Sequence, residues 1–121
     1  MKRDVVKEKS FEFAVAIVNL YKELTHYKKE FVLSKQILRS GTSIGANIRE
    51  AKNAESKADF IHKLGIAQKE CDETLYWLEL LRATDYITLD NFTKLKTDAE
   101  EILKIIRSII LTTKKNLTNN S

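Results

Sequence analysis

Hydrophobic residues recur along the chain at alternating steps of three and four, the spacing that places side chains on one face of an α-helix. Four segments carry this pattern. Their apolar positions are Phe13, Ile17, Leu20 and Leu24; Ile37, Gly41, Ile44, Ile48 and Ala51; Phe60, Leu64, Ala67, Cys71, Thr74, Leu78 and Leu81; and Phe92, Leu95, Ala99, Ile102, Ile106 and Ile109. Four such segments joined by short links predict an all-α fold, an antiparallel up-down-up-down four-helix bundle.

Residues 40–51 are the segment in which pattern and propensity conflict. The run Ser-Gly-Thr-Ser-Ile-Gly-Ala-Asn-Ile-Arg-Glu-Ala holds six residues that disfavour helix, at a combined cost of roughly 4 kcal/mol relative to Ala. Tertiary packing must therefore supply the stability that helix propensity does not provide in this segment. Gly41 and Gly45 lie four residues apart, which predicts a buried helix that a neighbouring backbone approaches closely. We expect the amide of Asn47, at the border of this face, to bond a neighbouring helix or turn.

Polar residues at the edges of the pattern predict where the helices begin. Ser10, Ser34 and Ser56 are candidate N-caps of the first three helices, and either Thr88 or Asp90 is the candidate for the fourth. Each of these side chains can accept a hydrogen bond from an N–H group in the first helical turn.

The first helix is expected to run to about Leu24, with residues 25–33 as a connector. It carries a second apolar stripe, formed by Phe11, Ala14, Val18 and Tyr21. A helix with so broad an apolar face touches more than one neighbour. The charged start, residues 1–9, and the polar end, residues 112–121, are interpreted as flexible parts of a single domain spanning 1–121.

Composition agrees with a helical protein that has its own core. Of the 121 residues, 43% are hydrophobic and 31% are charged, with no Pro and only three Gly, whereas an all-β chain needs more turn residues. No apolar run reaches the roughly 18 residues of a membrane span, and the N-terminus lacks the apolar block of a signal peptide. Cys71 is the single cysteine, so no intramolecular disulfide is possible. A cytoplasmic protein that does not contact membranes is expected.

The sequence offers no convincing catalytic or metal-binding set. Asp59 and His62 have the spacing of half a di-metal carboxylate site, but a second such pair and inward-facing Glu residues are missing. Cys71 lies on the core stripe, where a thiol is usually a small hydrophobe. No phosphate-cradling glycine loop occurs. We predict no catalytic residue, no metal and no cofactor.

Positive charge is concentrated on the second helix. Residues 31–54 carry four basic side chains and one acidic one, Glu50, within a chain of net charge +4. The basic residues are Lys35, Arg39, Arg49 and Lys52. They lie on or beside the face opposite the core, with only Glu50 nearby to offset them. Such a face is either simply solvated or a site for phosphates. Few aromatic residues accompany it, so base stacking is poorly supported and binding would be backbone-driven and salt-sensitive.

The third helix has a second apolar surface. Ile66, Trp77 and Leu80 lie well away from its core stripe. Exposing such a patch is unfavourable in a monomer, which predicts that these three residues form an interface with another subunit.

Two stretches carry a resemblance to a known family. They are Arg-Ser-Gly-Thr-Ser-Ile-Gly-Ala-Asn-Ile-Arg-Glu-Ala at 39–51 and Ser-Lys-Ala-Asp-Phe at 56–60, and residues 67–79 also fit. The chain resembles the four-helix-bundle proteins encoded by intervening sequences in bacterial large-subunit ribosomal RNA genes. Many relatives read Asn-Ile-Ala-Glu-Gly where this chain has Arg49 and Ala51, so its helix is expected to run further before it ends.

The resemblance implies a bundle without catalytic activity, in a family whose function is mostly uncharacterised. That family is related to the accessory variability determinant of diversity-generating retroelements, a homopentamer whose basic surface engages a reverse transcriptase and nucleic acid. The resemblance therefore implies a homopentamer and supports binding of RNA or DNA through the basic face. The alternative is a protein-interaction scaffold, or accessory subunit, that docks a partner enzyme without contacting nucleic acid.

Overall fold

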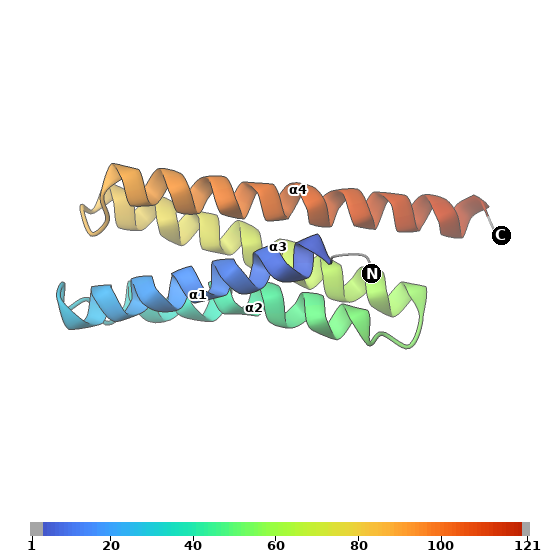
Figure 1. The fold of residues 1–121 in the computed structure, drawn as a ribbon, viewed down its shortest axis with the longest axis horizontal. Coiled ribbons are helices and arrows are strands. Elements are labelled where there is room, and N and C mark those ends of the chain that lie inside the picture. The colour runs from blue at the N-terminus through green and yellow to red at the C-terminus, as the bar shows by residue number, and fades with distance from the viewer. Residues whose placement is uncertain (1–3, 120–121) are drawn as a thin grey trace.

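The computed structural model describes residues 4–119. Its helices are α1 (Val5–His26), α2 (Leu33–Lys52), α3 (Lys57–Ala83) and α4 (Leu89–Asn119). They pack side by side in alternating directions, each against its neighbour in sequence, and α4 closes the bundle against α1 (Figure 1). The predicted all-α, antiparallel four-helix bundle is confirmed. None of the described helices combines the length and apolarity needed to cross a bilayer.

One hydrophobic core runs along the bundle, and the predicted stripes supply it. The second-helix stripe from Ile37 to Ala51 is completely enclosed, and so is most of the third, from Leu64 to Leu81. Only members near the stripe ends, Phe60, Phe92 and Ile109, are half-buried. Phe13, Ile17, Leu20 and Leu24 of α1 are buried, as is Val6, which lies one turn before the expected start of that helix.

The predicted close approach of two backbones is confirmed between α1 and α2. A Cβ atom at Gly41 would lie 2.9 Å from the side chain of Ile17, and one at Gly45 would lie 3.3 Å from the carbonyl oxygen of Ser10. The expectation for Asn47 is wrong. Its Nδ2 donates to the carbonyl oxygen of Ser43, 2.8 Å away on its own helix, because that group lies within reach one turn earlier.

The first helix begins earlier than expected. Its N-cap is Asp4, whose Oδ1 accepts from the N–H of Lys7 at 3.1 Å. Ser10, the expected cap, is instead buried within the helix, where its Oγ donates to the carbonyl oxygen of Lys7. Burial of Val6 in the core explains the extra turn, since it gives residues 5–9 an apolar anchor.

The last helix also continues further than expected. Residues 112–119 are helical, so their interpretation as an unstructured tail is wrong. Thr113 and Leu117 prolong the stripe of Ile109 at steps of four, although Leu117 is 38% exposed. Residues 1–3 and 120–121, to which the same interpretation applied, lie outside the described part of the chain.

The start of α2 is capped by a carboxylate, so the expected cap, Ser34, is wrong. Glu30 Oε1 accepts from the N–H groups of Val32 and Leu33 at 3.0 and 2.8 Å, and its Oε2 accepts from Ser34 at 2.7 Å. Burial of Glu30 opposes ionisation, but hydrogen bonds from Leu33, Ser34 and Val32 outweigh it and lower the pKa of the carboxyl. One side chain thus satisfies three N–H groups that the helix itself leaves unpaired.

The caps of the other two helices are as predicted. Ser56 Oγ accepts from the N–H of Asp59 at 3.0 Å, and Thr88 Oγ1 accepts from the N–H of Asn91 at 3.2 Å. In both cases the hydroxyl residue directly precedes the helix, where its side chain reaches the third residue after it.

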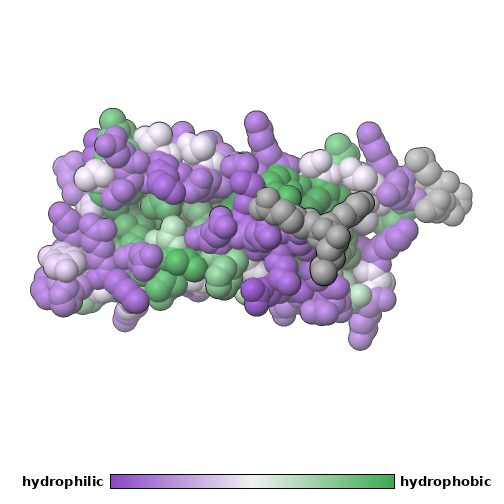
Figure 2. Space-filling view, viewed as in Figure 1, coloured by the Kyte–Doolittle hydropathy of each residue, from purple (hydrophilic) through white to green (hydrophobic). Residues whose placement is uncertain are grey.

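The seam between α1 and α4 is the most open side of the bundle. It holds a slit of about 190 Å³, bridged on its rim by the ion pair between Lys9 Nζ and Glu101 Oε1 at 2.8 Å. Figure 2 shows hydrophobic surface along this seam between rows of hydrophilic side chains. Beyond the first residues of α1, α4 runs on towards its C-terminal end (Figure 1), where Leu111 is 58% exposed.

Candidate nucleic-acid interface

The outer face of the α1–α2 hairpin carries a shallow groove of about 250 Å³. Small residues form much of its lining, because the glycines of α2 draw α1 close. The lining residues of α1 are Lys7, Ser10, Phe11 and Ala14, and those of α2 are Thr42, Gly45, Ala46 and Arg49. The groove thus combines two cations and one aromatic ring with a lining of small side chains.

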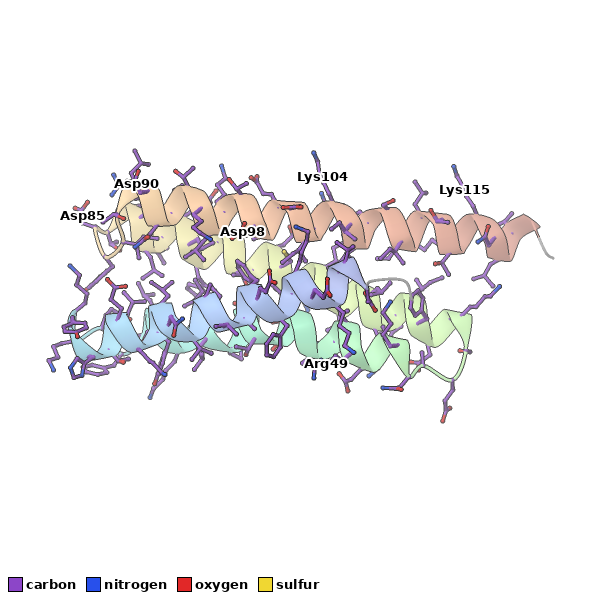
Figure 3. All side chains as sticks on the ribbon, viewed as in Figure 1. Arg49, Asp85, Asp90, Asp98, Lys104 and Lys115 are labelled. Atoms are coloured by element: carbon purple, nitrogen blue, oxygen red, sulfur yellow. The ribbon has the colours of Figure 1, made fainter. Side chains whose placement is uncertain are left out.

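Arg49 lies over the ring of Phe11. Its Cζ atom is 5.4 Å from the ring centroid, within the range of a cation–π contact, and 55% of Phe11 is exposed. Figure 3 shows Arg49 on the side of the bundle away from α4. Neither Arg49 nor Lys7 forms an ion pair with a carboxylate of residues 4–119. Both cations are therefore available to an external anion.

Phe11 is the residue of this groove that the sequence pattern did not single out as a candidate for a site. Base stacking was poorly supported because α2 has few aromatic residues, but the fold brings an aromatic ring from α1. The sequence signal for Phe11 is the second apolar stripe of α1, whose residues are not buried in the core. Ala14, Val18 and Tyr21 of that stripe are only half-buried, and they follow the same side of α1 as Phe11.

Arg39 has a different environment from Arg49. Its Nη1 pairs with Glu70 Oε2 at 3.0 Å, and its Nη2 pairs with Glu73 Oε2. The hydrogen bond from Arg39 lowers the pKa of the Glu73 carboxyl. The expectation that only Glu50 offsets the basic face is therefore wrong, because α3 brings two carboxylates to it.

The remaining two predicted cations also differ from each other. Lys52 Nζ pairs with Asp4 Oδ2 at 3.1 Å, whereas Lys35 is exposed on the first turn of α2 and forms no ion pair within the described residues. The four predicted residues thus divide into two with carboxylate partners, Arg39 and Lys52, and two without, Lys35 and Arg49. That they contact nucleic acid remains a prediction.

The predicted interface residues lie on α3 beside the Arg39 ion pairs. Ile66, Trp77 and Leu80 are all half-buried. Trp77 packs against the core, and its Nε1 donates to Glu73 Oε1 at 3.3 Å. Glu73 therefore connects a residue of the basic face with a residue of the predicted interface. The interface itself remains a prediction.

The side chains considered for catalysis and metal binding have structural roles. Cys71 is buried, its Sγ donates to the carbonyl oxygen of Ala99 at 3.2 Å, and burial raises its pKa to about 12. A thiol in this state is a poor nucleophile. Asp59 Oδ2 accepts from the N–H of Glu55 at 3.4 Å, next to the start of α3. Within residues 4–119 no three His, Cys, Asp or Glu side chains are grouped so as to hold a metal ion.

Comparison with known proteins identifies relatives of the whole bundle. The model of the family described as 23S rRNA-intervening sequence protein matches residues 2–108. A crystal structure of a protein of unknown function from the S23 ribosomal protein family of Bacteroides thetaiotaomicron is 65% identical. The match covers 87% of this chain and 97% of that one, with a TM-score of 0.86. No curated protein matches the chain.

Proposed function

Since the chain belongs to the 23S rRNA-intervening sequence protein family, we propose that it is a non-catalytic bundle that binds RNA through the outer α1–α2 face. The observation that carries this proposal is Arg49, which lies over the exposed ring of Phe11 and has no carboxylate partner among the described residues. Lys7 lines the same groove. Lys35 extends the positive charge towards the other end of α2.

The groove suits a phosphate and the base attached to it. Arg49 and Lys7 supply the charge that neutralises phosphate oxygens, and this term dominates affinity for nucleic acid. Gly45 and Ala46 leave space for a backbone to approach. The exposed part of the Phe11 ring, beside Arg49, offers a stacking surface that accepts any base. Such a site binds with little sequence preference, because most of its contacts are to the phosphate backbone.

The test compares Arg49→Ala and Lys7→Ala with Arg39→Ala and Lys104→Ala. Affinity for a labelled RNA is measured by fluorescence anisotropy across a salt series. The first two variants should bind more weakly, and each should reduce the salt slope by about one. Arg39 is held by two carboxylates, and Lys104 lies on the outer side of α4 (Figure 3), so their variants should bind almost as the unmodified protein does. Equal effects of all four variants, or no RNA binding by the unmodified protein, would contradict the proposal.

We further propose that the protein is a homo-oligomer, a pentamer by its family resemblance, with Ile66, Trp77 and Leu80 in the interface. Leu80→Glu and Trp77→Ala should shift the assembly towards monomer, because a charge or a lost ring disrupts a packed apolar contact. Light scattering measures the mass. Leu111→Glu is the matched control, since it makes the same change as Leu80→Glu at a residue of α4 that is 58% exposed and outside the proposed interface. A monomeric unmodified protein would contradict this proposal.

The second candidate function is a scaffold that docks a partner protein, such as an enzyme. The observation in its favour is the adjacency of a half-buried Trp77 and the exposed Arg39 across Glu73, since Trp and Arg dominate protein interfaces. This candidate predicts capture of a specific protein that survives nuclease treatment and is lost in Trp77→Ala. RNA binding that is lost in Arg49→Ala, with no such protein captured, would favour the first function.

A further inference from the structure

We infer that the loop between α1 and α2, residues 27–32, is a stacking platform for unpaired bases, which makes single-stranded RNA the preferred ligand. The inference rests on the proposed function, because it places a second contact on the same hairpin. The first contact is the groove at Phe11 and Arg49, near the start of α1. The loop lies at the other end of α1 (Figure 1).

The loop exposes large hydrophobic side chains that the fold itself does not need. Tyr27 is 75% exposed, Val32 71% and Phe31 53%, and the first two exceed every other large hydrophobic residue described. Three such side chains thus lie within six residues of one loop. Large apolar side chains gathered in this way on a surface usually mark a site of interaction.

The backbone that carries these side chains is firmly held. The carboxylate of Glu30 binds the N–H groups of Val32, Leu33 and Ser34, and the N–H of Glu30 itself donates to the carbonyl oxygen of Leu24 at 2.9 Å. Ser34 Oγ donates to the carbonyl oxygen of Glu30 at 2.9 Å. A loop fixed in this way presents Tyr27 and Phe31 with little entropy left to lose on binding.

The charge of the loop favours a polyanion. Lys28 and Lys29 are exposed, whereas the one acidic residue of the loop, Glu30, is only 8% exposed and turned inward onto the helix start. The solvent-facing charge of the loop is therefore wholly positive. The neighbouring turn between α3 and α4 is acidic, with Asp85 and Asp90 exposed (Figure 3). Lys28 lines a pocket with Glu23 and Asp85, so these carboxylates offset part of its charge, and Lys29 is the second cation of the loop.

Aromatic rings next to lysines are the means by which proteins bind single strands, since rings stack on bases while cations follow the phosphates. Sixteen residues separate Phe11 from Tyr27, which is about 24 Å along a helix and about 160° around it, so the two rings lie on different sides of α1. The loop is therefore a second contact, separate from the groove. A strand bound at the loop alone falls within the site sizes of known single-strand binders, about 4–16 nucleotides. A duplex keeps its bases paired and cannot use the rings.

The experiment measures affinity for a fluorescein-labelled oligoadenylate RNA of about 12 nucleotides and for an RNA duplex of about 12 base pairs. Tyr27→Ala and Phe31→Ala should each weaken single-strand binding about tenfold and leave duplex binding and the salt slope unchanged, because no charge is lost. Tyr76→Ala is the matched control, an exposed aromatic residue on α3. Thermal melting confirms that the variants remain folded, which is expected since both side chains face solvent.

Phe31→Leu separates stacking from a general apolar contact. It should bind the single strand as weakly as Phe31→Ala, because Leu has no π-face. Binding equal to that of the unmodified protein would overturn the inference and indicate a protein-type docking surface. Equal loss of single-strand and duplex binding in the loop variants, or no loss in either, would also overturn it. Single-strand binding that depends on Tyr27 but not on Arg49 would refute RNA binding at the groove and support base stacking at the loop. An unmodified protein that binds neither RNA would refute both proposals.

Discussion

Arg39 and Arg49 are ten residues apart on the same exposed side of α2, yet they have opposite surroundings. Arg39 lies in the N-terminal half of the helix and is held by Glu70 and Glu73 of α3. Arg49 lies in the C-terminal half and covers the ring of Phe11 of α1. The sequence of α2 gives no reason to treat them differently.

The difference comes from the helix that each arginine meets. Glu70 and Glu73 of α3 are three residues apart and thus share a face, so that a guanidinium can reach both. Opposite Arg49, α1 presents an aromatic ring and Lys7 instead of carboxylates. A basic residue on a bundle surface is therefore available to a ligand only if the neighbouring helix lacks an acid at that level.

Overpacking the contact between α1 and α2 should disturb the helix pair that carries Arg49 and Phe11, whereas the contacts of Arg39 are with α3. In Gly41→Ala the new Cβ would lie 2.9 Å from the side chain of Ile17, so that side chain or α1 must shift. We expect the free energy of unfolding to fall by about 1–3 kcal/mol, the usual effect of overpacking, as measured by urea denaturation. Gly65→Ala is the matched control, because no atom lies within 4 Å of its new Cβ, and it should stabilise the protein by about 0.5–1 kcal/mol. A Gly41→Ala variant as stable as the unmodified protein would contradict the close approach.

Removing the charge of Glu30 should loosen the half of α2 that carries Arg39. We expect Glu30→Gln to lower the free energy of unfolding by about 1–2 kcal/mol, because the carboxylate caps the helix. The folded-state pKa of Glu30 is lowered from 4.5, so its contribution is present above that pH and is lost as the pH falls through the lowered value. Urea denaturation between about pH 7 and pH 3 should therefore show a smaller acid-dependent loss in Glu30→Gln. Parallel pH profiles of the two proteins would contradict this role.

The two arginine contacts should both be weak, but they should differ in their response to salt. A double-mutant cycle of Arg39 and Glu73 should give about 0.2–1 kcal/mol at low salt, since the Arg39 side chain is half exposed, and less at about 1 M salt. The cycle of Arg49 and Phe11 should give about 0.5–1 kcal/mol. Thermal or urea denaturation of the single and double variants measures both couplings. The absence of any coupling between Arg39 and Glu73 at low salt would show that the pair does not form in solution.

The fold was predictable because its signal is local. The stripes of α2, α3 and α4 repeat every three or four residues, and the two glycines of α2 lie on such a stripe, so both the bundle and the close approach follow from neighbouring positions. The sequence signal for the late end of α4 is also local. Thr113 and Leu117 continue its stripe, but the polar composition around them concealed it.

The chemistry of the surface was not predictable, because it depends on residues far apart in sequence. Glu70 is 31 positions from Arg39, and Phe11 lies on a different helix from Arg49. The prediction of Ser34 as the cap of α2 was wrong for another reason. Ser34 is a favoured cap type, but the turn that precedes it lets a carboxylate reach three N–H groups together, which one hydroxyl cannot do.

The length of α4 has a consequence for how the molecule opens. Past Ile106, which is fully enclosed, α4 continues into turns where Leu111 is mostly exposed. Amide protons there are protected by the helix alone, without cover from α1. Native-state hydrogen exchange should therefore show protection that decays stepwise from Ile106 towards Leu117, through fraying that is independent of global unfolding.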